Sequence, residues 1–169
     1  IRRPPIRHAI RLTLEGIFKN LQQANVFMPE KLNVAVVGTG YWGKNLLRNF
    51  NDLGVLYAFC EIDQTSRDQF SQRYHLAKPY ESYIDILADD LIDAVVISTP
   101  AATHGELVRQ ALEANKDVFV EKPLCLDVEE AEALRDLASS LGLTLMVGHL
   151  LLYHPAFRAV KEFVDSGKL

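Results

Sequence analysis

The feature that most restricts the fold is a glycine-rich loop between a strand-like run and a helix-like run. Residues 33–38 read Asn-Val-Ala-Val-Val-Gly, a short apolar run rich in β-branched side chains that is typical of a strand buried on both faces. Residues 38–43 have the pattern G-x-G-x-x-G, and residues 44–53 carry apolar side chains on one helical face before Gly54. The sequence therefore predicts a strand, a tight glycine turn and a helix in that order.

Each glycine of this loop has its own role in a dinucleotide-binding turn. Gly38 permits the turn, Gly40 lets the backbone approach a pyrophosphate, and Gly43 allows the helix to pack close to the strand. The N–H groups of the first helical turn, around Tyr41 and Trp42, favour an anion because a helix N-terminus carries unpaired donors and a positive dipole end. The alternative is an ordinary tight turn in which Trp42 serves packing only.

An acidic residue follows the second apolar run, residues 55–60. Glu61 lies roughly 20 positions beyond the glycine loop, where a carboxylate contacts the adenosine ribose in this fingerprint. Its charge would repel a 2′-phosphate, and the nearest arginine, Arg67, falls within the next predicted helix. We therefore expect NAD as the cofactor in preference to NADP. The alternative for Glu61 is a solvated acid at a strand end.

The remainder of the chain continues to alternate between strand-like and helix-like segments. Further strands are predicted at residues 77–80, 93–99, 117–120 and 144–147, and further helices at residues 65–74, 82–88, 103–112 and 127–141. Strands that alternate with helices pair in parallel through right-handed crossovers. The expected fold is therefore α/β, a doubly wound parallel sheet of the Rossmann type with six strands in the order 3-2-1-4-5-6.

The pattern also predicts helix caps and buried faces. Capping pairs are expected at two helix N-termini: Thr103 with Glu106, and Asp127 with Glu130. Inward-facing side chains are expected in two helices: Ile84 and Leu87 in the first, and Ala131, Leu134, Ala138 and Leu141 in the second.

Composition and charge exclude several classes of protein. Of the 169 residues, 49% are hydrophobic and 24% are charged, so the chain is not disordered. Beyond residue 27 there are 13 Lys and Arg against 21 Asp and Glu, and this acidic balance argues against a nucleic-acid partner. The longest nearly apolar stretch, residues 141–153, is shorter than the roughly 20 residues that span a bilayer. Cys60 and Cys125 have no partner at ligand spacing, which predicts no disulfide framework, no metal site and a cytoplasmic location.

Residues 1–27 differ from this acidic body, with five Lys and Arg against one Glu. Apolar residues recur there at helical spacing, so the segment predicts a basic amphipathic helix. Such a helix suits an anionic membrane surface or a targeting peptide, whereas the simpler interpretation is upstream sequence before a domain that begins near Met28. We expect residues 1–32 to be an extension outside the core and residues 33–150 to form the dinucleotide-binding domain.

Several loops that carry chemistry are expected at one edge of the sheet. Ligands of doubly wound sheets bind beyond the carboxyl ends of the strands. This rule places three further segments beside the glycine loop and Glu61: Thr99-Pro100, Glu121-Lys122-Pro123 and Gly148-His149. A crevice shared by these segments is the predicted cofactor site.

With these motifs the chain, from about residue 33 to residue 169, resembles the Gfo/Idh/MocA family of sugar-related oxidoreductases. The resemblance rests on the glycine loop, on Ser98-Thr-Pro-Ala-Ala-Thr-His104 and on Glu121-Lys-Pro123, which is the most specific of the three. Residues 148–157 are most similar to the branch of UDP-N-acetyl-glucosaminuronate 3-dehydrogenases. The resemblance implies hydride transfer between a sugar or nucleotide-sugar hydroxyl and NAD, at C3 of a UDP-N-acetyl sugar in that branch.

The resemblance also implies roles for individual residues. Five residues flank the nicotinamide, the second proline often in a cis peptide: Thr99, Pro100, Glu121, Lys122 and Pro123. Lys122 is the implied catalytic lysine, which hydrogen-bonds the reacting hydroxyl or accepts its proton; a surface lysine is the alternative. His104 either approaches the nicotinamide ribose or only occupies the start of its helix. Glu61 stands where the family often has Asp, which keeps the charge on a longer arm.

The residues after the sixth predicted strand add further candidates. His149 is a second catalytic candidate, and Tyr153 and His154 are candidates to face the substrate. The alternative is that these three residues only occupy the end of a strand or the start of a helix and have no role at the site.

The family also has a second domain of mixed α and β structure that binds the sugar and mediates oligomer contacts. The resemblance implies that residues 151–169 begin the helix leading into that domain, which is missing here, and that the full enzyme is a homo-oligomer. We therefore expect the cofactor-binding half of an enzyme, inactive alone. The alternatives are a non-catalytic NAD-binding regulatory module and an inactive truncated fragment.

Overall fold

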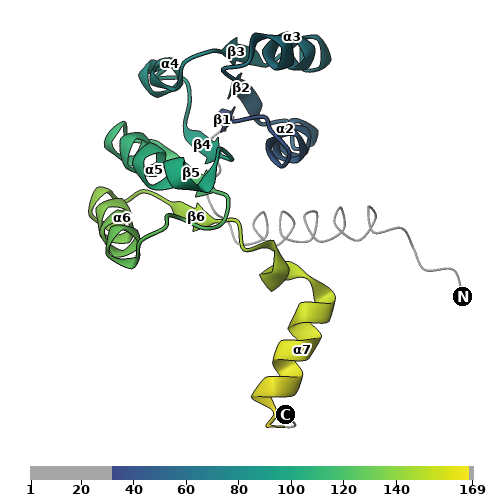
Figure 1. Cartoon of the computed structure of the whole chain (residues 1–169), viewed down its shortest axis with the longest axis vertical. Coiled ribbons are helices and arrows are strands. Elements are labelled where there is room, and N and C mark those ends of the chain that lie inside the picture. The colour runs from purple at the N-terminus through teal and green to yellow at the C-terminus, as the bar shows by residue number, and fades with distance from the viewer. Residues whose placement is uncertain (1–31, 168–169) are drawn as a thin grey trace, which may run out of the picture. The chain divides into compact units, whose positions relative to one another are not determined.

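The computed structural model describes residues 32–167, which divide into two units, residues 32–149 and residues 150–167. The first unit is a parallel sheet of six strands in the order β3-β2-β1-β4-β5-β6 (Figure 1). The strands are β1 Val34–Val37, β2 Leu56–Cys60, β3 Lys78–Tyr80, β4 Ala94–Ile97, β5 Asp117–Val120 and β6 Leu145–Val147. The predicted strand order and parallel pairing are confirmed.

Helices cover both faces of the sheet, as the doubly wound prediction requires (Figure 1). The helices of this unit are α2 Gly43–Asp52, α3 Gln64–Arg73, α4 Tyr83–Ala88, the short 3-10 helix η1 Ala101–Thr103, α5 His104–Glu113 and α6 Val128–Leu141. Helices α2 and α3 lie on one face of the sheet, and α4, α5 and α6 lie on the other.

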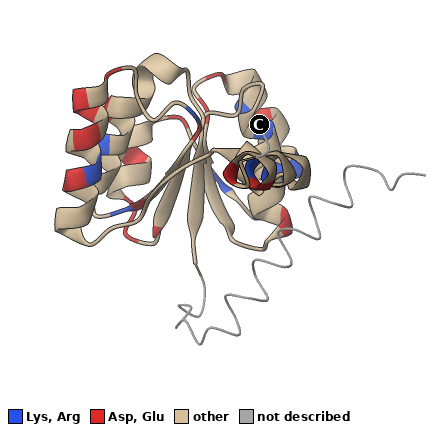
Figure 2. Ribbon diagram, turned by 90° about the horizontal axis from the view of Figure 1, so that it is seen from below, with Lys and Arg blue, Asp and Glu red and all other residues tan. Residues whose placement is uncertain are grey.

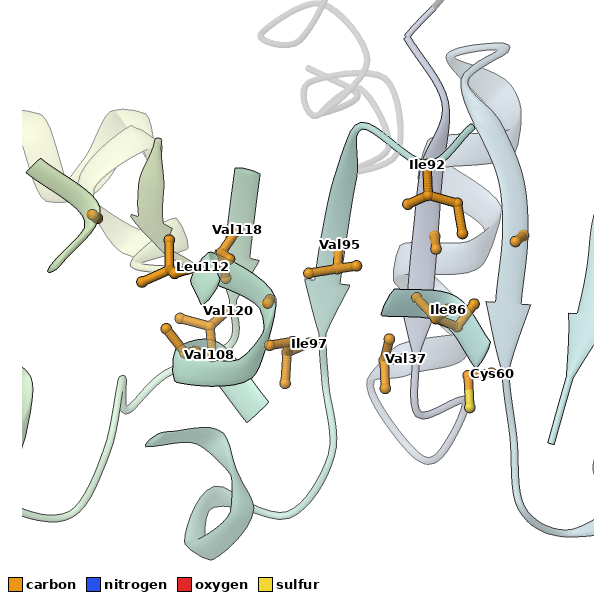
Figure 3. Packing of buried hydrophobic residues seen from close by; sticks show 14 of the residues in the cluster. Val37, Cys60, Ile86, Ile92, Val95, Ile97, Val108, Leu112, Val118 and Val120 are labelled. Atoms are coloured by element: carbon orange, nitrogen blue, oxygen red, sulfur yellow. The ribbon is translucent and has the colours of Figure 1, made fainter. Parts of the chain in front are cut away.

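The core has two layers because successive side chains of a strand point to opposite faces. In β1, Ala35 and Val37 pack on the side of α4, α5 and α6, whereas Val34 and Val36 pack on the side of α2. Figure 3 shows the first layer, where Ile86 of α4 lies near the strand side chains. The strands β1, β2, β4 and β6 contain no charged residue, β3 and β5 contain one each, Lys78 and Asp117, and most charges lie on the surrounding helices and loops (Figure 2).

Two predictions of inward-facing side chains are wrong. Ile84 is 62% exposed, because α4 begins at Tyr83 and turns Ile86 and Leu87 toward the sheet at the spacings i+3 and i+4. Leu141 is 46% exposed, since it is the last residue of α6 and the left-handed Gly142 ends the helix there.

The two predicted caps have different outcomes. The Asp127 side chain accepts a hydrogen bond of 2.9 Å from the backbone N–H of Glu130, which confirms the cap of α6. The capping box at Thr103 does not form, because η1 runs directly into α5 and holds Thr103 in helical geometry. The Thr103 hydroxyl instead donates to the Pro100 carbonyl at 2.8 Å.

The second unit contains a 3-10 helix, η2 Leu150–Tyr153, and the helix α7 Pro155–Asp165. His154 caps α7, and its Nδ1 accepts a hydrogen bond from the backbone N–H of Ala156 at 3.2 Å. The predicted basic helix of residues 1–27 lies outside the described residues. Within residues 32–167, no helix is long and apolar enough to cross a membrane, and no group of His, Cys, Asp and Glu is arranged to hold a metal ion.

Candidate functional site

The glycine loop is fixed by close backbone packing at two of its glycines. Gly38 has a φ of +83°, which side chains rarely tolerate, and the Ser98 hydroxyl donates to its carbonyl at 2.7 Å. A Cβ atom on Gly43 would lie 2.0 Å from the Gly38 carbonyl oxygen, so only glycine fits at the start of α2. These contacts agree with the predicted roles of Gly38 and Gly43 in the turn and the packing.

The other half of the loop is open. A Cβ atom on Gly40 would have no described atom within 4 Å, and Tyr41 is 86% exposed. Trp42 is the N-cap residue of α2, and its side chain forms no cap hydrogen bond with any described residue. In the first turn of α2, the N–H groups of Lys44 and Asn45 donate to the carbonyls of Gly40 and Trp42, at 3.3 Å and 2.8 Å. The space at Gly40 and the positive end of the α2 dipole suit an anion, which fits a dinucleotide pyrophosphate.

The Glu61 carboxylate lies beside the glycine loop, at the end of β2. Its Oε2 accepts hydrogen bonds from the Thr39 N–H at 3.0 Å and from the Thr39 hydroxyl at 2.5 Å, and its Oε1 accepts one from the Asp63 N–H at 3.0 Å. Partial burial raises the pKa of Glu61, but the hydrogen bonds from Thr39 and Asp63 outweigh this effect and lower the pKa below its usual value. Glu61 is therefore a fixed, ionised acceptor.

Two residues hold Glu61 and the loop after it through contacts that the sequence does not predict. Thr39 is an unspecified position of the G-x-G-x-x-G motif, and the motif gives no signal for its side chain. Arg67 donates from Nη1 to the Glu61 carbonyl at 2.7 Å and to the Ile62 carbonyl at 3.2 Å, and from Nη2 to the Glu81 carboxylate at 3.2 Å. The guanidinium is thus occupied in holding the loop after β2.

The segment after β4 is tied to the segment after β5 by one histidine. His104 is only 1% exposed, and its Nε2 lies 2.8 Å from the Thr99 carbonyl oxygen. Its Nδ1 lies 2.7 Å from the Pro123 carbonyl oxygen. Both ring nitrogens are occupied by protein atoms, so His104 has no ring nitrogen left for direct contact with a ribose. Pro100 is exposed beside Thr99.

The Glu121-Lys122-Pro123 segment combines a buried acid with an exposed lysine. The Lys122-Pro123 peptide bond is cis, as the resemblance implied. Glu121 is 8% exposed; its Oε2 accepts a hydrogen bond of 3.3 Å from the Lys122 N–H, and its Oε1 has no partner among residues 32–167. A Cβ atom on Gly148 would lie 3.3 Å from that Oε1 and 3.0 Å from Phe119. The unpaired oxygen is buried beside Gly148.

The last three candidate residues belong to two different units of the structure. His149 is exposed at the end of β6, and its backbone N–H donates to the Val147 carbonyl at 2.7 Å. Tyr153 and His154 belong to the second unit, which is described by itself. An apolar groove lined by α6, β6 and residues 124–128 contains none of the predicted site residues.

Comparison with known proteins agrees with this geometry. The family described as "Oxidoreductase family, NAD-binding Rossmann fold" (GFO_IDH_MocA) matches residues 32–149. The chain is 32% identical over 148 residues to scyllo-inositol 2-dehydrogenase (NAD(+)) of Bacillus subtilis, an alignment that covers 84% of this chain and 42% of the relative. It is 30% identical over 139 residues to D-xylose 1-dehydrogenase [NADP(+)] of Haloarcula marismortui, with 79% of this chain and 39% of the relative covered.

A solved structure has the same fold. The 3-ketoreductase KijD10 of Actinomadura kijaniata, solved with NADP and TDP-benzene, aligns with a TM-score of 0.74 and 31% identity over 82% of this chain and 43% of that chain. The chain therefore spans less than half the length of the relatives compared here. One of these relatives is named for NAD and another for NADP, and KijD10 was solved with NADP. This chain belongs to the Gfo/Idh/MocA family of NAD(P)-dependent, sugar-related oxidoreductases.

Proposed function

We propose that this chain is the cofactor-binding part of an oxidoreductase that transfers hydride between a sugar or nucleotide-sugar hydroxyl and NAD. The observation that carries the proposal is the Glu61 carboxylate, held by Thr39 directly beside the open glycine loop. An ionised acceptor at this place hydrogen-bonds ribose hydroxyls and repels a 2′-phosphate. This is why we favour NAD, although relatives with either cofactor are known.

Two groups of residues would hold the two ends of NAD. Near the pyrophosphate and adenosine, the residues are Gly38, Gly40, Tyr41, Trp42, Gly43 and Glu61. Near the nicotinamide, they are Thr99, Pro100, Glu121, Lys122 and Pro123, with His104 acting through the carbonyls of Thr99 and Pro123. The place of Glu121 and Lys122 directly after β5 supports this second group, because ligands of doubly wound sheets bind beyond the carboxyl ends of the strands.

Lys122 is the proposed catalytic residue. A bound nicotinamide supplies the position that accepts or returns hydride. The exposed Lys122 side chain is free to reach a substrate hydroxyl at the same edge, where its ammonium donates a hydrogen bond or its neutral amine takes up the hydroxyl proton. His149, exposed at the end of the neighbouring β6, is the second candidate for proton transfer.

The substrate that we propose is more specific than the family assignment. Relatives include an inositol dehydrogenase, a xylose dehydrogenase and a nucleotide-sugar ketoreductase, which supports a polyhydroxylated substrate. The sequence of residues 148–157 supports C3 of a UDP-N-acetyl sugar. We also propose that the whole protein has a sugar-binding domain after residue 150, is a homo-oligomer and works in the cytoplasm.

Calorimetric titration of the chain with NAD and with NADP tests the cofactor proposal. The wild-type chain should bind NAD more tightly, and Glu61→Ala should lose that preference. Glu113→Ala, which removes an exposed acid at the end of α5, is the matched control and should keep the preference. Equal affinity for the two cofactors in the wild type would contradict the assignment to Glu61.

A further inference from the structure

His104 connects the two segments that flank the nicotinamide side of the proposed site. It is the first residue of α5, and it is 1% exposed. Its Nε2 and Nδ1 lie 2.8 Å and 2.7 Å from the carbonyl oxygens of Thr99 and Pro123. Both distances lie within the range of N–H···O hydrogen bonds. One buried ring therefore spans the ends of β4 and β5.

The two carbonyls belong to the segments that we place on either side of the nicotinamide. Thr99 follows β4, and Pro123 ends the Glu121-Lys122-Pro123 segment after β5. A carbonyl oxygen accepts hydrogen bonds, and each ring nitrogen faces one, so an N–H of His104 donates to at least one of the two segments.

We propose that His104 is a clamp, a positioning residue whose buried ring connects the carbonyls of Thr99 and Pro123. Through these bonds it sets the spacing between the Thr99-Pro100 and Lys122-Pro123 segments, and so the place of the Lys122 side chain relative to the nicotinamide. This inference rests on the proposed function, because the spacing matters for a ligand only if a nicotinamide binds between the two segments.

A pair of ligands separates positioning from general stability. NAD carries a nicotinamide, whereas ADP-ribose has the same adenosine and pyrophosphate without it. His104→Gln keeps a side-chain amide donor but reaches only one carbonyl, so NAD binding should weaken about tenfold or more, while ADP-ribose binding should change by less than about twofold. His75→Gln, which alters an exposed histidine, is the matched control and should change neither affinity. An equal loss for both ligands, or no loss for NAD, would overturn the clamp as a positioning device.

Backbone amide NMR tests the clamp without any cofactor. In His104→Gln the amide signals of Thr99 and Lys122 should shift, whereas His75→Gln should leave them in place. Unchanged signals at Thr99 and Lys122 in His104→Gln would overturn the clamp. Failure of the wild-type chain to bind either NAD or ADP-ribose would contradict the proposed function instead, and the amide signals would still decide whether His104 positions the two segments.

Discussion

Thr39 and Glu61 are joined by two hydrogen bonds that end on the same carboxylate oxygen, one from the Thr39 N–H and one from its hydroxyl. Thr39 is only 4% exposed, so this arrangement is shielded from water on the side of Thr39. The pair connects the glycine loop to the end of β2. The position of the acid that we assign to cofactor choice therefore depends on a loop residue that the glycine motif leaves unspecified.

Removing the Thr39 hydroxyl should loosen Glu61 without removing its charge. Thr39→Val deletes one of the two hydrogen bonds, a loss of about 0.5–1.5 kcal/mol, which corresponds to a weakening of NAD binding by a few-fold to about tenfold. Thr39→Ser keeps the hydroxyl and should restore most of the affinity. Calorimetric titration of both variants checks this prediction. Equal NAD affinity in Thr39→Val and the wild type would show that the hydroxyl does not position Glu61 for the cofactor.

Alanine at two glycines of the same loop should have opposite effects. Gly43→Ala places a Cβ atom 2.0 Å from a backbone oxygen, so we expect the free energy of unfolding to fall by about 3 kcal/mol. Gly40→Ala meets no described atom within 4 Å and should change that free energy by less than about 1 kcal/mol. It should nevertheless weaken NAD binding about tenfold or more, because its methyl group lies where the backbone must approach the pyrophosphate.

Urea denaturation combined with calorimetry separates these two effects. A Gly40→Ala variant that binds NAD as tightly as the wild type would show that the open half of the loop is not the pyrophosphate site.

The acid sensitivity of folding should depend on Asp89, which follows α4. The hydrogen bond from the Tyr80 hydroxyl is the main cause that lowers the pKa of Asp89 to about 2, with further bonds from the Leu91 N–H and the Lys78 ammonium. The folded pKa lies below the ordinary value of 3.8, so Asp89 stabilises the fold above pH 3.8, and this contribution is lost as the pH falls toward 2.

Asp89→Asn should therefore destabilise the chain at neutral pH by about 1 kcal/mol, a value that allows for solvent screening, and by less near pH 2. Chemical denaturation across this pH range measures the difference, with Asp90→Asn as the exposed control. A destabilisation that is the same at both ends of the range would contradict the role of the ionised carboxylate.

Lys122 should be dispensable for folding and necessary for chemistry. Because its side chain is exposed, Lys122→Met should change the free energy of unfolding by less than about 0.5 kcal/mol. In the full-length protein, NADH formation from a sugar substrate should fall by about 100-fold or more, the size of a lost acid–base contribution. Lys161→Met in α7 replaces another exposed lysine and should leave the rate unchanged. A Lys122→Met enzyme with the wild-type rate would remove Lys122 from the mechanism.

The sequence predicts the sheet well because strand order follows from local patterns and from the handedness of crossovers. The glycine loop, Glu61 and the carboxyl-end segments were identifiable for the same reason, since each lies directly after a predicted strand. Contacts between segments were not identifiable. The Thr39 bond to Glu61 and the His104 bonds to Thr99 and Pro123 depend on which side chains meet in three dimensions, and periodicity does not determine this.

The errors have the same origin. The apolar character of Ile84 predicts an inward side chain, but the preceding residue, Tyr83, packs against the core instead, and its hydroxyl donates to the Leu107 carbonyl at 2.7 Å. Thr103 and Glu106 had the spacing of a capping box, but the 3-10 turn before α5 places Thr103 in helical geometry. In both cases the neighbouring segment decides the local conformation.

Mapping NAD binding by NMR tests most directly whether the edge of the sheet at the carboxyl ends of the strands is the dinucleotide site. The backbone amide signals of the chain are assigned and followed during titration with NAD. We predict saturable shifts at Gly40, Glu61, Thr99 and Lys122, which together span the proposed site. Saturable shifts confined to the groove beside α6, or no shifts at any concentration in a folded sample, would contradict the account.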